Sequence, residues 1–236
     1  MAAQALSFEC QNQLPNKHNV LTMKRNIIYL VDENPPARRA NVEALRRLLD
    51  NQEIQVKELE PLTNMADYNR LVAEHTTAAF VLDQRMKQAG LVNYNGTDLA
   101  AHLRSIDSKM PIYILTGYAE EKGDFDGSEY LVEYIIGKGE MRDQNSKEAK
   151  IIKARMLRHL DVFNDVLDER EQRFHDLLIK SLSTQLTQTE QDEMNKIEGE
   201  TTAPIQAAER LKEQELGKSV EQLRRLLDSG QLPLKA

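Results

Sequence analysis

The chain has 236 residues, a formal net charge of -7 and one cysteine, Cys10. This length suits one ordinary domain with an appendage, or two small domains. The acidic balance, with no basic stripe apparent in the sequence, argues against nucleic-acid binding, because phosphate backbones call for clustered Lys and Arg. A single cysteine excludes a disulfide framework and a thiolate metal site.

No segment of the sequence has the pattern of a secretion signal or of a membrane span. Residues 1–24 lack a basic start followed by a sustained apolar stretch, and no later run is apolar for the roughly 20 residues that a span needs. We therefore expect a cytoplasmic protein without membrane attachment. Because residues 1–24 are polar and precede the first apolar run, we expect them to form a flexible tail.

Between residues 26 and 142, apolar strand-like runs alternate with amphipathic stretches, which predicts repeated β-α units around a parallel sheet. The predicted helices open at Pro35 and cover 65–74 and 97–106. The fourth helix is the weakest, because 121–127 holds two glycines and two aspartates. In the first helix we expect four arginines to face water mostly: Arg38, Arg39, Arg46 and Arg47. The predicted strands are 26–31, 53–59, 78–82, 112–115 and 134–137.

Four of these apolar runs end in polar side chains. Asp83 ends the run 78–82, and Asp32 with Glu33 follows the run 26–31. Thr116 ends the run 112–115, and Lys138 follows Gly137. Sites in open parallel α/β sheets lie at the carboxyl ends of the strands, so we expect these side chains to converge although they are far apart in sequence.

After Ser146 the sequence predicts nearly continuous helix from Lys147 to about Ser183, roughly 55 Å long at about 1.5 Å per residue. Its apolar stripe is typical of a helix that supercoils with another, so we expect a coiled coil with a partner helix of the same chain or of another chain. The predicted domain boundaries are 25–143, 144–186 for the long helix, and 187–236 for a helical carboxyl-terminal region. The stripe consists of Met156, Leu160, Phe163, Leu167, Phe174 and Leu177.

The carboxyl-terminal region is predicted to hold two helices. Thr187 and Glu190 have the spacing of a capping box, and a polar helix follows over 191–198. We expect a break at 199–204, which begins with Gly and ends with Pro, and a second helix over 205–227. One face of the second helix carries Leu216, Val220, Leu223 and Leu227.

The residues from about 26 to 142 resemble the receiver domain of two-component response regulators. The resemblance rests on four motifs in order: Val-Asp32-Glu33, Leu-Asp83-Gln-Arg-Met86, Pro111-Ile-Tyr-Ile-Leu-Thr116-Gly and Ile-Ile-Gly-Lys138. It implies an α/β fold, namely a flavodoxin-like, doubly wound, five-stranded parallel sheet. The long helix and the helical carboxyl-terminal region would follow this sheet.

The resemblance implies that Asp83 accepts a phosphoryl group from the phosphohistidine of a histidine kinase or phosphotransfer protein, or from a small phosphodonor. It implies a Mg2+ cofactor held by Asp32, Glu33, Asp83 and the backbone carbonyl of Arg85, since Mg2+ prefers oxygen ligands. In isolation, an acid pair just before Pro35 is more often a helix N-terminal charge than a metal site.

The resemblance also assigns roles around the phosphoryl group. Lys138 would pair with Asp83 and then with the phosphoryl oxygens, and Thr116 would move to hydrogen-bond the phosphate. Taken alone, such a threonine is usually a turn hydroxyl and such a lysine is usually solvated. Arg85 and Tyr118 stand where receivers gate the attacking water, and because both are large we expect slow self-dephosphorylation.

One departure from the family concerns how the signal leaves the site. Receivers usually carry an aromatic switch residue three positions before the lysine, but Ile135 stands there and Tyr134 is one place away. Signalling by rotation of that aromatic side chain is therefore not expected in its usual form.

The leading functional hypothesis is a phosphorylation-controlled interaction module. Phosphorylation of Asp83 would control oligomerisation or the binding of a helical protein partner through the carboxyl-terminal helices. We expect no enzymatic activity beyond self-phosphotransfer and self-dephosphorylation, and no nucleic-acid or membrane partner. Two alternatives stay open: a phosphate relay or sink without an output of its own, and a scaffold that works without phosphorylation.

Overall fold

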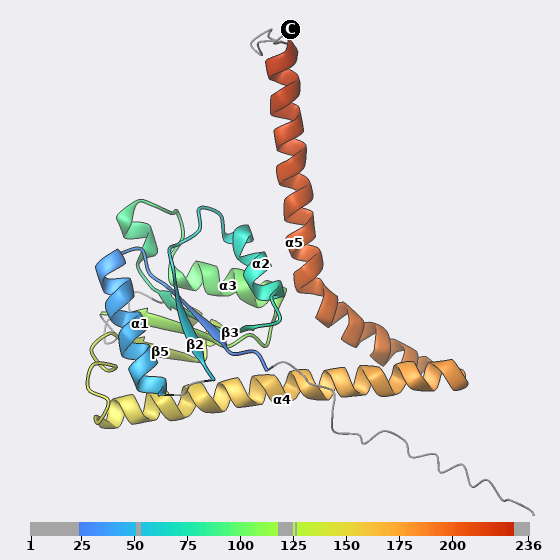
Figure 1. Cartoon of the computed structure of the whole chain (residues 1–236), viewed down its shortest axis with the longest axis horizontal. Coiled ribbons are helices and arrows are strands. Elements are labelled where there is room, and N and C mark those ends of the chain that lie inside the picture. The colour runs from blue at the N-terminus through green and yellow to red at the C-terminus, as the bar shows by residue number, and fades with distance from the viewer. Residues whose placement is uncertain (1–23, 51–52, 118–124, 126, 229–236) are drawn as a thin grey trace, which may run out of the picture.

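The computed structural model describes residues 24–50, 53–117, 125 and 127–228. Its strands and helices alternate up to β5 and are followed by two long helices (Figure 1). The strands are β1 (Ile27–Val31), β2 (Gln55–Leu59), β3 (Thr77–Asp83), β4 (Ile112–Thr116) and β5 (Tyr134–Gly137). The α-helices are α1 (Pro35–Leu49), α2 (Asn69–Ala73), α3 (Gly96–Ile106), α4 (Lys147–Ser183) and α5 (Gln188–Asp228). Short 3-10 turns are η1 (Met65–Tyr68), η2 (Met86–Ala89) and η3 (Ser128–Leu131).

The five strands form one parallel sheet in the order β2-β1-β3-β4-β5. This is the strand order of flavodoxin-like doubly wound folds. Every residue of β1, β3 and β4 is buried, as expected for strands covered on both faces. The register places Asp83 beside Leu115 and Thr116 beside Gly137, so the strand ends lie along one edge. The predicted fold class is confirmed.

Alternate side chains of the strands build two apolar layers, one on each face of the sheet. On one face, Leu30, Val81 and Tyr113 pack with residues of α1 and with the first half of α4. On the other face, Tyr29 and Phe80 pack with residues of α2 and α3. The layers differ in how they are closed, because the first one depends on a helix that continues well past the sheet.

The predicted helix starts agree with the capping contacts. Asn34 caps α1, because its Oδ1 accepts a hydrogen bond from the Ala37 nitrogen at 3.1 Å. The start of α3 carries a capping box between Asn95 and Asp98. The predicted helix at 65–74 is instead the turn η1 followed by the five-residue helix α2. Arg38 corrects the expectation for α1, because its side chain is only 11% exposed and turns toward the end of β1.

The predicted weakness of the fourth β-α unit stays a prediction, because the described residues cover this unit only in part. Between β4 and β5 these residues contain only the 3-10 turn η3. Most of the glycine- and aspartate-rich segment 121–127 lies outside the described residues.

Helix α4 has the predicted bounds, but its apolar stripe is covered differently from the prediction. Met156, Leu160 and Phe163 are buried in the apolar layers of the sheet, where α4 also contacts α1. The part of α4 beyond the sheet pairs with a second long helix, and Leu177 in this part is 1% exposed. Helical periodicity shows that one face of a helix is apolar, but it does not identify what covers that face.

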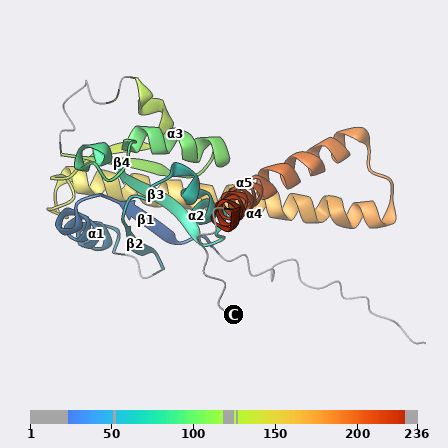
Figure 2. The same cartoon turned by 90° about the horizontal axis from the view of Figure 1, so that it is seen from above.

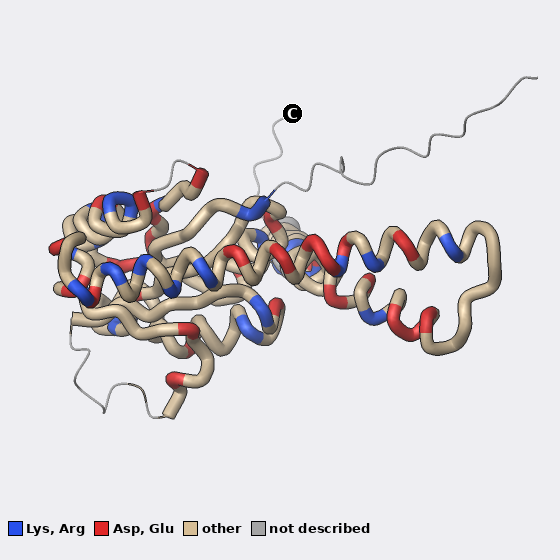
Figure 3. The backbone as a smooth tube through the Cα atoms, turned by 90° about the horizontal axis from the view of Figure 1, so that it is seen from below, with Lys and Arg blue, Asp and Glu red and all other residues tan. Residues whose placement is uncertain are grey.

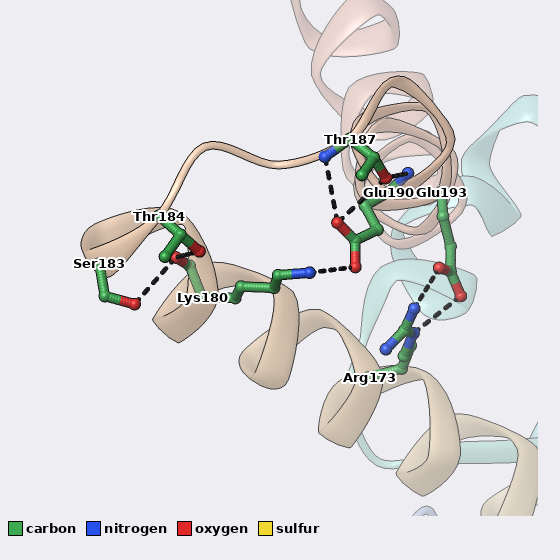
Figure 4. A network of polar contacts seen from close by, with 7 residues as sticks. All are labelled: Arg173, Lys180, Ser183, Thr184, Thr187, Glu190 and Glu193. Atoms are coloured by element: carbon green, nitrogen blue, oxygen red, sulfur yellow. Dashed lines mark hydrogen bonds and ion pairs between the residues drawn. The ribbon is translucent and has the colours of Figure 1, made fainter.

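The partner of the far part of α4 is the first part of α5, which returns as an antiparallel hairpin (Figure 2). Figure 4 shows the ion pairs between them: Arg173 reaches Glu193 at 2.6 Å, and Lys180 reaches Glu190 at 2.6 Å. The predicted capping box is present, with reciprocal hydrogen bonds between Thr187 and Glu190. The hydrogen bond from Lys180 is the main reason that the pKa of Glu190 is lowered to about 2.

The predicted break at 199–204 is wrong, because α5 is helical from Gln188 to Asp228 with Pro204 inside it. Proline removes one backbone donor and normally kinks a helix. Here the Oγ1 atoms of Thr201 and Thr202 donate to the carbonyls of Ile197 and Glu198, both at 2.8 Å, and side-chain bonds of this kind bend a helix without ending it. Figure 1 shows that α5 changes direction part-way along instead of ending.

The middle of α5 docks on the face of the sheet domain formed by α2 and α3. Asn69 Nδ2 donates to the carbonyl of Ala207 at 3.3 Å, and Asn69 Oδ1 lies 2.8 Å from His102 Nε2. Because Oδ1 of Asn69 is an acceptor, His102 carries its proton on Nε2 when it is neutral. Beyond this contact the helix projects away from the domain (Figure 1).

Candidate functional site

The carboxyl ends of β1, β3, β4 and β5 lie at the same edge of the sheet. The chain leaves β1 toward one face through α1 and leaves β3 toward the other face through α3, so β1 and β3 flank a topological switch point. Asp32 follows β1 directly, and Asp83 is the last residue of β3. The two carboxylates therefore stand on either side of the crevice in which sheets of this type bind ligands.

Lys138 joins these two acids. Its Nζ lies 2.6 Å from Asp83 Oδ1 and 3.2 Å from Asp32 Oδ2. The two carboxylates are almost fully buried, whereas the lysine side chain is 26% exposed. Burial by itself lowers the pKa of Lys138, but the hydrogen bond and charge of Asp83, together with those of Asp32, outweigh burial and raise it. The ammonium is therefore charged and neutralises part of the acidic site.

Asp32 is held in place by three further groups. Its Oδ1 accepts from the Asn34 nitrogen at 2.9 Å, and its Oδ2 accepts from Asn41 Nδ2 at 3.2 Å. Arg38 donates to the backbone carbonyl of Asp32 at 2.7 Å. The sequence analysis missed Asn41 and Arg38, because both belong to α1 and their role depends on how that helix crosses the strand end.

Asp83 is oriented by the loop that follows it. Its Oδ2 accepts from the Arg85 nitrogen at 2.7 Å, while its Oδ1 faces Lys138. The loop then folds back so that the Gly96 nitrogen donates to the Gln84 carbonyl at 3.1 Å. A Cβ on Gly96 would stand 2.5 Å from the carbonyl oxygen of Asp83, so this close approach requires glycine.

Thr116 and Arg85 lie at the same edge. Thr116 is buried, and its carbonyl accepts from the Lys138 nitrogen at 2.7 Å, which fixes the lysine beside the end of β4. The carbonyl of Arg85 accepts from the Gln88 nitrogen at 2.9 Å. Tyr118, the other predicted gating residue, lies outside the described residues.

Glu33 differs from the other acids of the site. It is half-buried, and its Oε2 is buried without a hydrogen-bond partner. Burial raises the pKa of Glu33, and the charges of Asp83 and Asp32 raise it as well, against a backbone hydrogen bond and the charge of Lys138. An unpartnered carboxylate oxygen beside the carboxyl groups of Asp83 and Asp32 is an electrostatic environment that favours a cation.

The donor atoms fit a divalent cation with oxygen ligands. Within the part of the chain that the structure describes, no three Asp, Glu, His or Cys side chains lie close enough together to hold one metal ion. Mg2+ does not require three, because it usually takes one or two carboxylates and keeps several waters. Asp32 and Asp83 supply two carboxylates that converge on one point, the ammonium of Lys138.

No protein-family model matches the chain, and no curated protein sequence matches it. The response regulator TrrA from Thermotoga maritima, solved in complex with Mg2+-BeF, is 19% identical, with a TM-score of 0.40 over 56% of this chain and 98% of that one. A CheY-like receiver domain protein from Methanospirillum hungatei JF-1 is 14% identical, with a TM-score of 0.40 over 59% and 97% of the two chains.

A further match is the structure of the histidine kinase ThkA in complex with TrrA, at 19% identity and a TM-score of 0.41 over 56% of this chain and 98% of that chain. These similarities are low, so the fold class rests on the strand order and not on the comparisons. The solved structures that resemble the first part of the chain are response regulator receiver domains, and a helical extension follows that part. No helix within the described ranges is long and apolar enough to cross a membrane.

Proposed function

We propose that this chain is a response regulator in which Asp83 accepts a phosphoryl group from a histidine kinase or phosphotransfer protein. The observation that carries the proposal is the convergence of Asp83 and Asp32 on Lys138, at 2.6 and 3.2 Å, at the carboxyl edge of a doubly wound sheet. Asp83 supplies a buried carboxylate nucleophile, Asp32 supplies a second acid, and Lys138 supplies a positively charged ammonium group.

The chemistry of the transfer follows from these groups. A carboxylate oxygen of Asp83 forms a bond to phosphorus while the bond from phosphorus to the donor nitrogen breaks, and the imidazole leaves with the electron pair. Transfer of this kind depends mainly on position and on neutralising the phosphoryl oxygens. Lys138 supplies one positive charge, and the Thr116 hydroxyl is the donor placed at the end of the neighbouring strand. When bound by Asp32 and Asp83, Mg2+ would supply further neutralisation of the phosphoryl oxygens.

We further propose that the signal leaves the site through α4. Tyr113 and Tyr134 lie on β4 and β5, the strands that end at Thr116 and beside Lys138, and both side chains face α4. Tyr113 Oη lies 3.1 Å from His159 Nδ1 with the rings stacked, and the Arg155 guanidinium lies 4.4 Å from the centre of the Tyr134 ring. A shift at the end of either strand therefore changes contacts made by α4.

This route is consistent with the position of the aromatic residue, which is Tyr134 instead of residue 135, the usual switch position. Ile135 packs in the layer with α2 and α3, whereas Tyr134 packs in the layer with α1 and α4. Moving the aromatic residue by one position moves it to the other face of the sheet. In this chain the aromatic side chain meets the long helix directly.

The test is incubation with acetyl phosphate and Mg2+, followed by intact-mass measurement. We expect the wild-type chain to gain one phosphoryl group and the Asp83→Asn variant to gain none. Asp161→Asn, an exposed acid on α4, is the matched control and should behave as wild type. Phosphorylation of the Asp83→Asn variant at the wild-type level would overturn the assignment of the phosphoacceptor.

A second measurement tests the output. Sedimentation velocity with beryllium fluoride and Mg2+ should change the oligomer mass of the wild-type chain or its binding of a helical partner, but should not change that of the Asp83→Asn variant. Phosphorylation without any change in association would favour a phosphate sink. Full biological activity of the Asp83→Asn variant would favour a scaffold.

A further inference from the structure

The charges of α4 are divided along its length. Residues 147–158 hold five cationic side chains and one acidic one, whereas residues 161–176 hold six acidic and two cationic ones. Figure 3 shows the Lys and Arg positions gathered on the first part of α4 and the Asp and Glu positions gathered on the next part. The sequence analysis found no basic stripe, because the acidic part of the same helix hides this one in the overall balance.

The separation of cationic and acidic residues along α4 is not explained by the stability of the helix itself. A helix dipole favours acids in the first turn, where Glu148 stands, but Lys147 and Lys150 stand in the same turn. Packing against α5 uses the two cations of the acidic part, since Arg170 pairs with Glu200 at 2.9 Å and Arg173 pairs with Glu193 at 2.6 Å. Among the outward-facing acids, Asp176 accepts a hydrogen bond from Gln172 Nε2 of its own helix at 3.0 Å, whereas Asp165 forms no ion pair within the described residues.

One exposed face of α4 carries both charges. Its residues recur at steps of three, four or seven, so they share a face, and this face lies away from the buried residues Ile152, Met156 and Leu160. Ile151 and Val162 on this face are 38% and 54% exposed. In the described part of the chain, neither Arg158 nor Asp165 forms an ion pair. We name this face the outer stripe; it consists of Lys147, Ile151, Arg158, Val162, Asp165, Glu169 and Asp176.

We propose that the outer stripe pairs antiparallel with the outer stripe of a second copy of this chain. A two-fold axis between residues 161 and 162 brings Arg158 opposite Asp165 of the second copy, and Lys147 opposite Asp176 of the second copy. Each contact then occurs twice, as in any isologous interface. Val162 lies at the axis, where the two copies of this apolar side chain meet.

A second copy of this chain is the partner whose charges complement both the cationic part and the acidic part of the outer stripe. A polyanion such as a nucleic acid would match the cationic part and be repelled by the acidic part. Because complementary charges give specificity and association rate more than affinity, and because these side chains are exposed, the pairing is weak and sensitive to salt. Its control by phosphorylation rests on the proposed function, whereas the pairing itself needs no phosphoryl group.

Charge reversal in the full-length chain tests the inference by sedimentation equilibrium at low salt. Arg158→Glu places two acids against each other at both contacts, and Asp165→Arg places two cations against each other. We expect each variant alone to have a dissociation constant raised about tenfold or more, which corresponds to about 1.4 kcal/mol. An equal mixture of the two variants should associate like wild type, because both contacts then join opposite charges.

The matched control is Arg47→Glu, which makes the same change of charge at an exposed position on α1; it should associate like wild type. A wild-type chain that stays monomeric, or a mixture that fails to restore association, would overturn the proposal. Binding of the wild-type chain to heparin with no self-association would overturn it in favour of a polyanion site. Asp83→Asn should pair like wild type without a phosphodonor, so a wild-type chain that pairs but does not respond to a phosphodonor would count against the proposed function alone.

Discussion

The carboxyl edge of the sheet and the projecting part of α5 are built in opposite ways. At the edge, Lys138 and Asp32 are 106 positions apart in sequence and yet bond at 3.2 Å, with the acid fully buried. On the projecting part of α5, four large apolar side chains are between 40% and 67% exposed: Leu216, Val220, Leu223 and Leu226. The edge is held by its own fold, whereas the projecting part of α5 leaves much of its apolar surface exposed, and an isolated helix in water is marginal.

Removing the cation at the edge should give the largest effect. Lys138→Met leaves Asp83 and Asp32 buried together without a neutralising charge, and the loss of one partner from a mostly buried pair costs about 3 kcal/mol. We expect the free energy of unfolding to fall by that amount in EDTA and to recover partly in Mg2+, measured by chemical denaturation. Lys150→Met, an exposed lysine on α4, should change little in either condition.

The buried apolar stripe of α4 and the exposed apolar stripe of α5 can be compared directly by mutation. Met156→Ala empties a site that is 1% exposed in the layer between α4 and the sheet, and should cost about 2 to 3 kcal/mol. Leu223→Ala removes a side chain that is 52% exposed and should stay within about 0.5 kcal/mol. Thermal unfolding of both variants measures the difference. Equal costs would mean that the projecting helix is covered in solution.

Gly96 tests how closely the loop after β3 must approach the carboxyl edge of the sheet. An added Cβ would meet the Asp83 carbonyl, so Gly96→Ala must move the loop or the strand end and should cost about 1 to 3 kcal/mol. Because the displaced strand end carries the phosphoacceptor, acetyl phosphate should also phosphorylate this variant more slowly. Gly199→Ala, where the added Cβ meets nothing within 4 Å, is the control and should be as stable as wild type or more stable.

The lifetime of the phosphorylated state tests whether the edge excludes water. Arg85 and Tyr118 are large at the two gating positions, so phosphorylated Asp83 should last much longer than seconds. Arg85→Ala should speed hydrolysis by about tenfold, equal to about 1.4 kcal/mol in the barrier. The measurement is loss of the phosphoryl group over time after removal of the donor. A wild-type lifetime of seconds or less would contradict the prediction.

A smaller effect is expected where α5 docks on the sheet domain. Burial lowers the pKa of His102 below its ordinary value of 6.5, so the unfolded chain binds more protons than the folded chain below that pH. Stability should therefore be complete above pH 6.5 and fall as the pH drops through that value. His102→Gln keeps a donor to Asn69 but does not titrate, so its stability should fall less between pH 7 and pH 5. Part of the slope should stay, because the pKa of His159 is lowered too.

The sequence was most informative where burial and polarity change abruptly. Buried runs that end in Asp83, Thr116 and Lys138 predict both the strands and the edge at which they meet, because parallel strands end on the same side. The hydrogen bonds that Asn41 and Arg38 make to Asp32 were not predictable. Helical periodicity cannot tell which polar side chain of α1 lies next to the end of β1.

Past the sheet, the sequence predicted the bounds of α4 and the capping box at Thr187 but not what the helices pack against. The stripe of α4 is covered by the sheet in its first half and by α5 in its second half, and both kinds of cover require the same spacing of apolar residues. At Pro204 the local rule for proline predicts a break, but α5 continues through this residue from Gln188 to Asp228.

The uninterrupted run of α4 from the sheet to the hairpin makes it a lever. The 16 residues from Asp168 to Ser183 extend about 24 Å beyond Leu167, which still packs against the sheet layer, at about 1.5 Å per residue. Each degree of tilt at the base then moves the hairpin end by roughly 0.4 Å, from this length alone. A tilt of a few degrees at Tyr113 or Tyr134 would therefore displace the far end by about an ångström.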